Sequence, residues 1–296
     1  MNKKILDFFE YIYDRQNLAF RKQQDKRPWT RDSVLHEYKF CNVRRFDDRG
    51  TKHFVEHMKG VQDLDTLIFN SVMYRIFNVS NFYSEILKTR YIPCYGKPFP
   101  WKKIVKEMDR AKEKGVRLFS TAYMICGIPE KDCPRPKDKH VNILLRLSKM
   151  TEDPEFYRLK RSLSVRDLMR NLRFKSQYLI GDFLAYQIVL DLSYFSIAKE
   201  ITVGVEKLDY CGPGTIYSLK NLFPKLSPEE GLRILYEKQD EYFSGLRIYR
   251  KKDWRKLCFP ESEIRMTDIE NCLCEYRKYF KLKTGIKTRI RRYRES

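Results

Sequence analysis

Long apolar runs are missing from this sequence. It contains no stretch of 18 apolar residues, and residues 1–9 lack the apolar core and cleavage site of a secretory leader. A membrane-spanning helix needs about 20 consecutive apolar residues. No membrane partner is therefore expected.

Sequence patterns for metal ions and for ATP are missing as well. The eight cysteines form no C-x-x-C pair, the four histidines are not spaced as ligands beside them, and no phosphate loop of the G-x-x-x-x-G-K-[ST] type occurs. Metal sites and other cofactors are therefore not expected. Scattered cysteines of this kind are usually reduced and buried, which indicates a cytoplasmic protein of a bacterial cell.

Positive charge, by contrast, is abundant. Sixty Lys and Arg face 39 Asp and Glu, for a net charge of +21, and they are interleaved with 20 Tyr, 19 Phe and 3 Trp. Cations contact phosphates and aromatic rings stack on bases, so nucleic acid is favoured over an anionic membrane surface. A basic protein that is merely soluble is the alternative. No obligate protein partner is indicated.

Helical periodicity predicts an all-α fold. Residues 3–22 place Ile5, Phe8 and Ile12 on one helix face. Further helices are expected at 61–78, 80–90, 100–114 and 116–125. Three helix starts match the capping-box spacing, namely Ser164 with Asp167, Ser227 with Glu230 and Thr267 with Glu270.

The proline-rich stretch 129–139 is predicted to join two lobes. It divides the chain into an N-terminal lobe, residues 1–135, a second lobe, residues 136–282, and a basic tail, residues 283–296. The last 16 residues carry seven Lys or Arg and one Glu. They are interpreted as a flexible phosphate-binding arm, with a plain solvated terminus as the alternative.

Three segments carry residues suited to chemistry. At 178–187, a glycine turn between two helices would let Gly181 approach a DNA backbone, although an ordinary bend has the same pattern. At 209–215, the amides of a Gly-Pro-Gly turn could hold a phosphate, or the turn could simply join two helices. At 40–51, paired Arg and Asp could preorganise donors for a base or form an exposed ion-pair loop.

Together these motifs resemble one family. The pattern Asn-Val-x-Arg-x-x-Asp-Arg-x-Thr at 42–51, the 181–187 hairpin with Asp191, the Gly-Pro-Gly turn and the polar segment 268–279 are similar to the alpha-glutamyl/putrescinyl thymine pyrophosphorylases and to the helical domain of 5-hydroxymethyldeoxyuridine DNA kinases. The similarity covers residues 5–290. It implies a two-lobed fold like that of the helix-hairpin-helix DNA glycosylases and action on hypermodified pyrimidines in double-stranded phage DNA.

The resemblance implies two possible functions. We expect a monofunctional DNA glycosylase that flips out and excises a hypermodified pyrimidine, such as glucosylated hydroxymethylcytosine, leaving an abasic site in anti-phage defence. The alternative is a phage transferase that replaces pyrophosphate on activated 5-hydroxymethyluracil in DNA with an amino acid or a polyamine.

Site residues follow from this interpretation. A carboxylate near the sugar would stabilise developing positive charge, with Asp209 as the first candidate and Asp191 and Asp48 in reserve. Base contacts are expected from Asn42, Arg44, Arg45, Arg49, Tyr186 and Gln187. Contacts to the DNA backbone are expected from Gly181, Gly212, Gly214, Thr215, Lys220, Lys278, Arg289, Arg291 and Arg292.

Overall fold

The computed structural model of the chain describes residues 2–80, 82–94, 99–120, 125, 131–162, 164–175, 179–246 and 264–293. Every regular element in these residues is helical, and the β structure among them is a single antiparallel bridge between Tyr38 and Arg292. The predicted all-α class is confirmed. No helix within the described ranges combines the length and apolarity that a membrane span requires.

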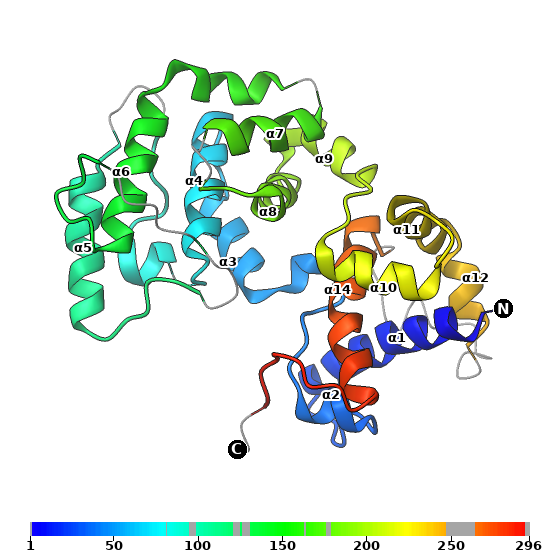
Figure 1. Cartoon of the computed structure of the whole chain (residues 1–296). Helices are drawn as coiled ribbons and strands as arrows, with labels where there is room; N and C mark the ends of the chain where they lie inside the picture. The colour runs from blue at the N-terminus through cyan, green and yellow to red at the C-terminus, as the bar shows by residue number, and fades with distance from the viewer. Residues whose placement is uncertain are drawn as a thin grey trace. The chain divides into compact units, whose positions relative to one another are not determined.

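The helices follow one another along the chain as labelled in Figure 1. Their bounds are α1 Lys3–Gln23, α2 Ser33–Glu37, η1 Arg45–Asp47, α3 Arg49–Met58, α4 Leu64–Phe77, the π-helix η2 Phe82–Leu87, α5 Trp101–Glu113, α6 Lys139–Glu152, η3 Pro154–Arg161, α7 Val165–Lys175, α8 Asp182–Leu192, η4 Ser196–Ala198, α9 Lys199–Glu206, α10 Pro213–Leu222, α11 Pro228–Glu237, α12 Gln239–Ser244 and α14 Met266–Lys283.

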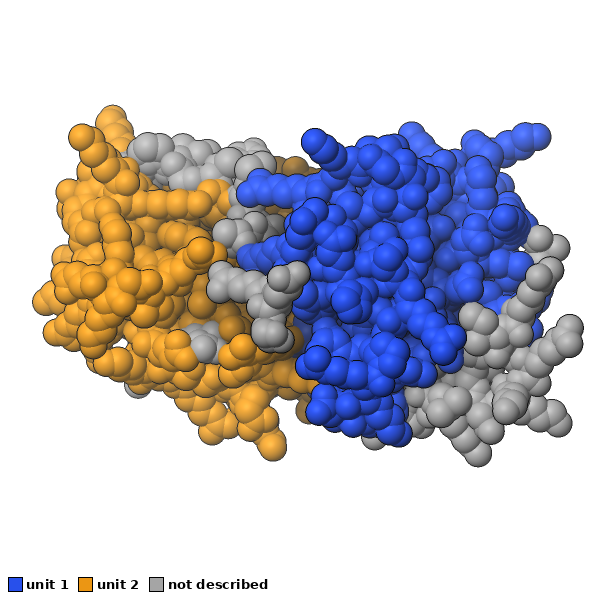
Figure 2. Space-filling model, turned by 90° about the horizontal axis from the view of Figure 1, so that it is seen from below, with its two compact units in different colours: residues 1–48, 206–296 blue, residues 49–205 orange. Residues whose placement is uncertain are grey.

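Two compact units make up the chain (Figure 2). Unit 1 joins residues 1–48 to residues 206–296, and unit 2 consists of residues 49–205. This division differs from the predicted one, because the boundary expected at 135/136 falls inside unit 2. Unit 1 is thus built from the two ends of the chain.

Aromatic side chains form the core of unit 1. Phe8 and Phe9, on the apolar face predicted for α1, are fully buried. The Phe8 ring centroid lies 5.2 Å from that of Tyr276 on α14, and the Phe9 ring centroid lies 4.8 Å from that of Phe243 on α12. Such edge-to-face pairs add to the stabilisation that burial of the rings provides. The core therefore ties α1 to helices from the other end of the chain.

Helices α4 and α8 form the centre of unit 2. All residues from Asp65 to Phe77 are buried, and α8 packs against both α4 and α7 (Figure 1). A helix buried on all sides needs an apolar sequence throughout, which the α4 sequence LDTLIFNSVMYRIF nearly satisfies. The polar exceptions are Asp65, Thr66, Asn70, Ser71 and Arg75. Among them, Asn70 and Arg75 donate to buried partners.

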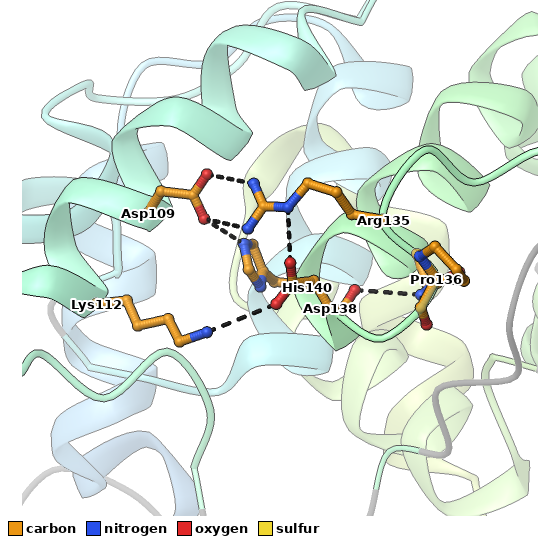
Figure 3. A network of polar contacts seen from close by, with 7 residues as sticks. Asp109, Lys112, Arg135, Pro136, Asp138 and His140 are labelled. Atoms are coloured by element: carbon orange, nitrogen blue, oxygen red, sulfur yellow. Dashed lines mark hydrogen bonds and ion pairs between the residues drawn. The ribbon is translucent and has the colours of Figure 1, made fainter.

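The segment that precedes α6 is fixed by ion pairs (Figure 3). The guanidinium of Arg135 lies 2.6 Å from carboxylate oxygens of both Asp109 on α5 and Asp138. Nε2 of His140 lies 2.9 Å from Asp109, and the Asn142 side chain donates to the carbonyl of Pro136 at 2.8 Å. These bonds fasten residues 135–138 to α5 and α6, which explains why the expected lobe boundary is not found there.

Two expectations about local structure are wrong. The helix expected at 116–125 is not formed at residues 116–120, because Gly115 adopts a φ of 75° and ends α5 as a left-handed C-terminal residue. Residues 121–124 lie outside the described residues. The basic tail is not a free arm up to residue 293, since the backbone amides of Lys39 and Tyr293 donate to Arg291 and Glu37 at 2.8 Å.

Candidate functional site

Helix α14 carries buried polar side chains that organise unit 1. Asp268, Asn271 and Glu275 lie on one face of the helix, because they are three and four residues apart. Glu270 lies on another face. All four side chains are 3% to 6% exposed. A buried charged group requires hydrogen-bond partners, and here the partners come from residues 41–45 and from the Gly-Pro-Gly turn.

The first face of α14 fixes the backbone of residues 41–45. The amide of Arg45 donates to Asp268 at 2.8 Å, and its guanidinium donates to the Asn271 side-chain oxygen at 2.9 Å. The Asn271 amide group in turn donates to the carbonyl of Asn42 at 3.0 Å. Burial raises the pKa of Asp268, although the amides of Arg45 and Arg265 oppose the shift. The carboxylate therefore serves as an anchor for the backbone.

Both polar groups of the Asn42 side chain are hydrogen-bonded within the protein. Its oxygen accepts a hydrogen bond from the buried Arg15 guanidinium at 2.8 Å, and its amide group donates to the carbonyl of Asp47 at 2.8 Å. A base held by Asn42 would have to compete with these two bonds. The geometry thus favours Asn42 as a residue that positions the segment.

An Arg–Asp pair of the predicted kind is found in this segment, between Arg44 and Asp47. Arg44 Nε lies 2.8 Å from Asp47, and both side chains are 23% exposed. The Asp48 carboxylate accepts from the amide of Asn42 at 3.3 Å. Arg49 is exposed at the first residue of α3, in unit 2. Arg44 is therefore paired within the protein and still able to reach a ligand.

The Gly-Pro-Gly turn faces a carboxylate of the chain itself. Glu270 accepts from the Gly212 amide at 3.3 Å and from the Thr215 hydroxyl at 2.8 Å. A helix N-terminus attracts anions, and at α10 the Glu270 carboxylate takes that position. A Cβ on Gly214 would lie 2.6 Å from the Cys274 sulfur, so this glycine lets α10 approach α14 closely. The geometry favours a structural turn over the predicted phosphate site.

Asp209 is a partly accessible carboxylate. Its side chain is 18% exposed, and one oxygen lies 3.9 Å from Nε of the half-exposed Arg233 on α11. This distance leaves the pair loosely held. Asp209 thus combines partial access to solvent with a neighbouring cation.

Asp191 has a different environment, in the interior of unit 2. Its side chain is 0% exposed, and both its oxygens accept from the guanidinium of Arg75, which also donates to the Thr51 hydroxyl at 3.4 Å. Tyr186 and Gln187 are likewise fully buried. These positions favour a role in the core of unit 2 over the base contacts and catalysis expected for them.

The predicted contacts to the DNA backbone are spread over both units. Gly181 is the N-cap of α8, and a Cβ added there would meet nothing within 4 Å. Lys220 is exposed on α10, whereas Lys278 pairs with Glu275. Burial lowers the pKa of Lys278, but the Glu275 carboxylate outweighs this effect and raises it. Arg289, Arg291 and Arg292 are exposed in the tail.

Two arginines central to these networks were not predicted from the sequence. Arg15 follows Phe8 and Ile12 on the buried side of α1, and Arg75 interrupts the apolar sequence of α4. A charged residue is almost never buried unless it is paired. An arginine at an apolar helix position was thus the available signal for a buried carboxylate or amide partner.

Comparison with known proteins gives the family. Residues 3–288 match the family model described as "5-hmdU DNA kinase, helical domain". The chain belongs to this family. A curated family relative, the 5-hmdU DNA kinase of Bacillus phage SP10, is 24% identical over 302 residues, which cover 92% of this chain and 44% of the relative. The chain thus spans less than half the length of that relative. No solved structure matches the present chain.

The family expected from the motifs is confirmed, but the expected enzyme class is wrong. The relative is named a kinase, which is a transferase, so the assignment as a monofunctional DNA glycosylase and hydrolase is overturned, together with the defence role built on it. The motifs did not indicate the reaction because many of their side chains form hydrogen bonds or ion pairs within the protein, as Asn42, Glu270 and Asp191 do. Bonds of this kind indicate a scaffold and not a reaction.

Proposed function

We propose that the chain modifies DNA by transferring an amino acid or a polyamine to 5-hydroxymethyluracil that carries pyrophosphate on its hydroxymethyl group. The family match over residues 3–288 carries this proposal, because the relative is named for 5-hmdU in DNA. The sequence has no phosphate loop for ATP. A step that follows phosphorylation therefore suits this chain better than phosphorylation itself. Its substrate would be double-stranded DNA with modified pyrimidines in the bacterial cytoplasm.

The proposed reaction is a substitution at the 5-methylene carbon of the base. The amine nitrogen attacks this carbon, a C–N bond forms, and the C–O bond breaks as pyrophosphate leaves with the electron pair. The nitrogen then loses one proton. Such a step needs a base for the proton and cations for the charge that develops on the leaving group.

Asp209 and Arg233 have the properties that this step requires. The Asp209 carboxylate is partly exposed and would accept the proton, and the half-exposed Arg233 would contact the pyrophosphate. Arg44, also partly exposed, is proposed to contact the substrate from the segment that α14 fixes. Buried carboxylates such as Asp191 lack this access.

The proposal is tested with a DNA duplex that carries pyrophosphorylated 5-hydroxymethyldeoxyuridine. Pyrophosphate release is followed with and without glutamate or putrescine, and the nucleosides are identified by mass spectrometry. We expect release that depends on the amine and a new 5-aminomethyl-type adduct. Asp209→Asn should lower turnover by about 100-fold or more without weakening DNA binding.

The matched control is Glu237→Gln, which neutralises an exposed carboxylate on the same helix as Arg233 and should keep full activity. Two results would contradict the proposal. Incorporation of the γ-phosphate of ATP into unphosphorylated DNA would make the chain a kinase. Release of pyrophosphate at the same rate without any amine would show that water is the acceptor.

A further inference from the structure

A groove between α1, α10 and α14 takes no part in the networks described above. It lies in unit 1 and is open to solvent on one side. Each helix contributes two polar, charged or aromatic side chains to the part of the lining considered below. These are Lys4 and Asp7 from α1, Tyr217 and Asn221 from α10, and Arg277 and Phe280 from α14.

Two aromatic side chains of the groove are exposed. Tyr217 is 37% and Phe280 38% exposed, although most aromatic side chains of unit 1 are packed in its core. Exposed aromatic residues that line a concavity mark surfaces that bind a partner. Part of this ring surface is covered, because Lys281 Nζ lies over the Tyr217 ring and the Tyr276 ring lies 6.2 Å from that of Phe280. The remaining exposed surface can contact a planar group.

Cations surround these rings. Lys4 and Arg277 line the groove, Lys4 Nζ donates to the carbonyl of Asn221 at 3.4 Å, and Lys281 Nζ lies 5.2 Å from the centroid of the Tyr217 ring. Asp7 is the acidic side chain in the lining. Two cations and one carboxylate in the lining, with Lys281 beside Tyr217, give the groove a modest positive balance, which complements an anionic ligand.

We propose that this groove binds a single-stranded segment of DNA, with an unpaired base against Tyr217 and Phe280 and the adjacent phosphates on Lys4 and Arg277. Aromatic rings that stack on bases, beside cations that follow the backbone, are the usual composition of single-strand sites. An apolar peptide would leave the cations without counter-charges. The inference rests on the proposed function only in taking DNA as the substrate, and reaching a base in a duplex requires local unpairing.

Photo-crosslinking locates the strand directly. A short single-stranded oligodeoxynucleotide with one 5-iododeoxyuridine is irradiated with the full chain, and the crosslinked residue is identified by mass spectrometry. We expect the adduct on Tyr217 or Phe280. Adducts found only outside the groove would overturn the proposal.

Affinity measurements separate stacking from charge. Tyr217→Leu/Phe280→Leu should weaken binding of the unmodified oligonucleotide by at least about fivefold, without changing the salt dependence. Lys4→Gln/Arg277→Gln should lower the slope of log K against log salt concentration by about one unit or more. Phe174→Leu, which alters the more exposed Phe174 of unit 2, is the matched control and should leave both quantities unchanged.

The experiments on the groove can succeed or fail independently of the amine-transfer assay. Crosslinks at Tyr217 in a chain that transfers no amine would support DNA binding in the groove and reject the proposed function. Amine transfer by a Tyr217→Leu/Phe280→Leu variant with unchanged oligonucleotide affinity would reject the groove alone. Equal urea midpoints of all variants would show that loss of folding is not the cause of any difference.

Discussion

At the scale of single residues, the pair of Arg75 and Asp191 shows how burial decides what a carboxylate can do. Asp191 is fully buried, and its two oxygens are held by one guanidinium. Removing one partner from such a pair leaves a buried charge without compensation. The pair is therefore expected to act through the stability of unit 2.

Asp191→Asn should lower the free energy of unfolding by about 3–5 kcal/mol. The measurement is urea denaturation of the full chain. Asp182→Asn is the control, because Asp182 is an exposed partner of Arg173 in the same unit and its loss should cost less than about 1 kcal/mol. Similar losses in both variants would contradict the structural role of Asp191.

Asp14 on α1 makes stability depend on pH. Burial raises the pKa of its carboxyl from 3.8 to about 6, and the nearby carboxylates of Glu10 and Asp32 add to the shift, which Lys283 opposes. A raised pKa in the folded state contributes stability that is fully present below about pH 4 and is lost as the pH rises through about 6.

Asp14→Asn should therefore stabilise the chain by about 1 kcal/mol at pH 7, a value reduced for the solvent screening of a half-buried group. At pH 4 the same substitution should have almost no effect. Urea midpoints at the two pH values measure the difference. A gain of equal size at both values would show that the charge of Asp14 is not its cause.

At the scale of elements, substitution of two glycines by alanine is expected to differ in its effect on stability, because one glycine lies against a neighbouring helix and the other does not. Gly214→Ala places a Cβ 2.6 Å from the Cys274 sulfur and should destabilise the chain by about 1–3 kcal/mol, because α10 must move away from α14. Gly181→Ala meets no atom within 4 Å and should cost less than about 1 kcal/mol.

DNA affinity then tests the role of the 178–187 hairpin. If the backbone at Gly181 approaches a phosphate, Gly181→Ala should weaken binding of duplex DNA several-fold at nearly unchanged stability. Fluorescence anisotropy measures the affinity, and urea denaturation measures the stability. Unchanged affinity would leave Gly181 as an ordinary helix junction.

Local patterns predicted those elements whose causes are local. The apolar periodicity of α1 and the capping box of Ser227 and Glu230 are found as expected. The capping box of Thr267 and Glu270 is wrong, because the N-cap of α14 is Arg265, two residues earlier, and the Asp268 carboxylate accepts from the amide of Arg265. Glu270 instead accepts hydrogen bonds from the Gly212 amide and the Thr215 hydroxyl, which are distant in the sequence.

The candidate site was less predictable, because its bonds join distant parts of the sequence. The segment 40–51 was recognisable from its density of Arg and Asp, yet the carboxylate that holds the Arg45 amide lies 223 residues further along. Spacing indicates which residues form a motif. It does not indicate whether an asparagine such as Asn42 faces a ligand or a buried arginine, since that depends on packing.

At the scale of the whole molecule, the net charge of +21 predicts DNA binding that weakens with salt. Lys287→Gln/Arg289→Gln, in the exposed part of the basic tail, should lower the salt slope of duplex binding by about two units. Lys103→Gln/Lys106→Gln on α5 removes the same charge from unit 2 and is the control. Equal slopes in the two variants would show that the tail makes no special contact.

The two-part composition of unit 1 also fixes the order in which the chain can fold during translation. Residues 49–205 leave the ribosome before α14 has been synthesised, so unit 2 can be complete while α1 still exposes its aromatic face. Unit 1 can therefore be completed only after α14 has been synthesised, and chaperones that bind apolar segments have access to residues 1–48 until then.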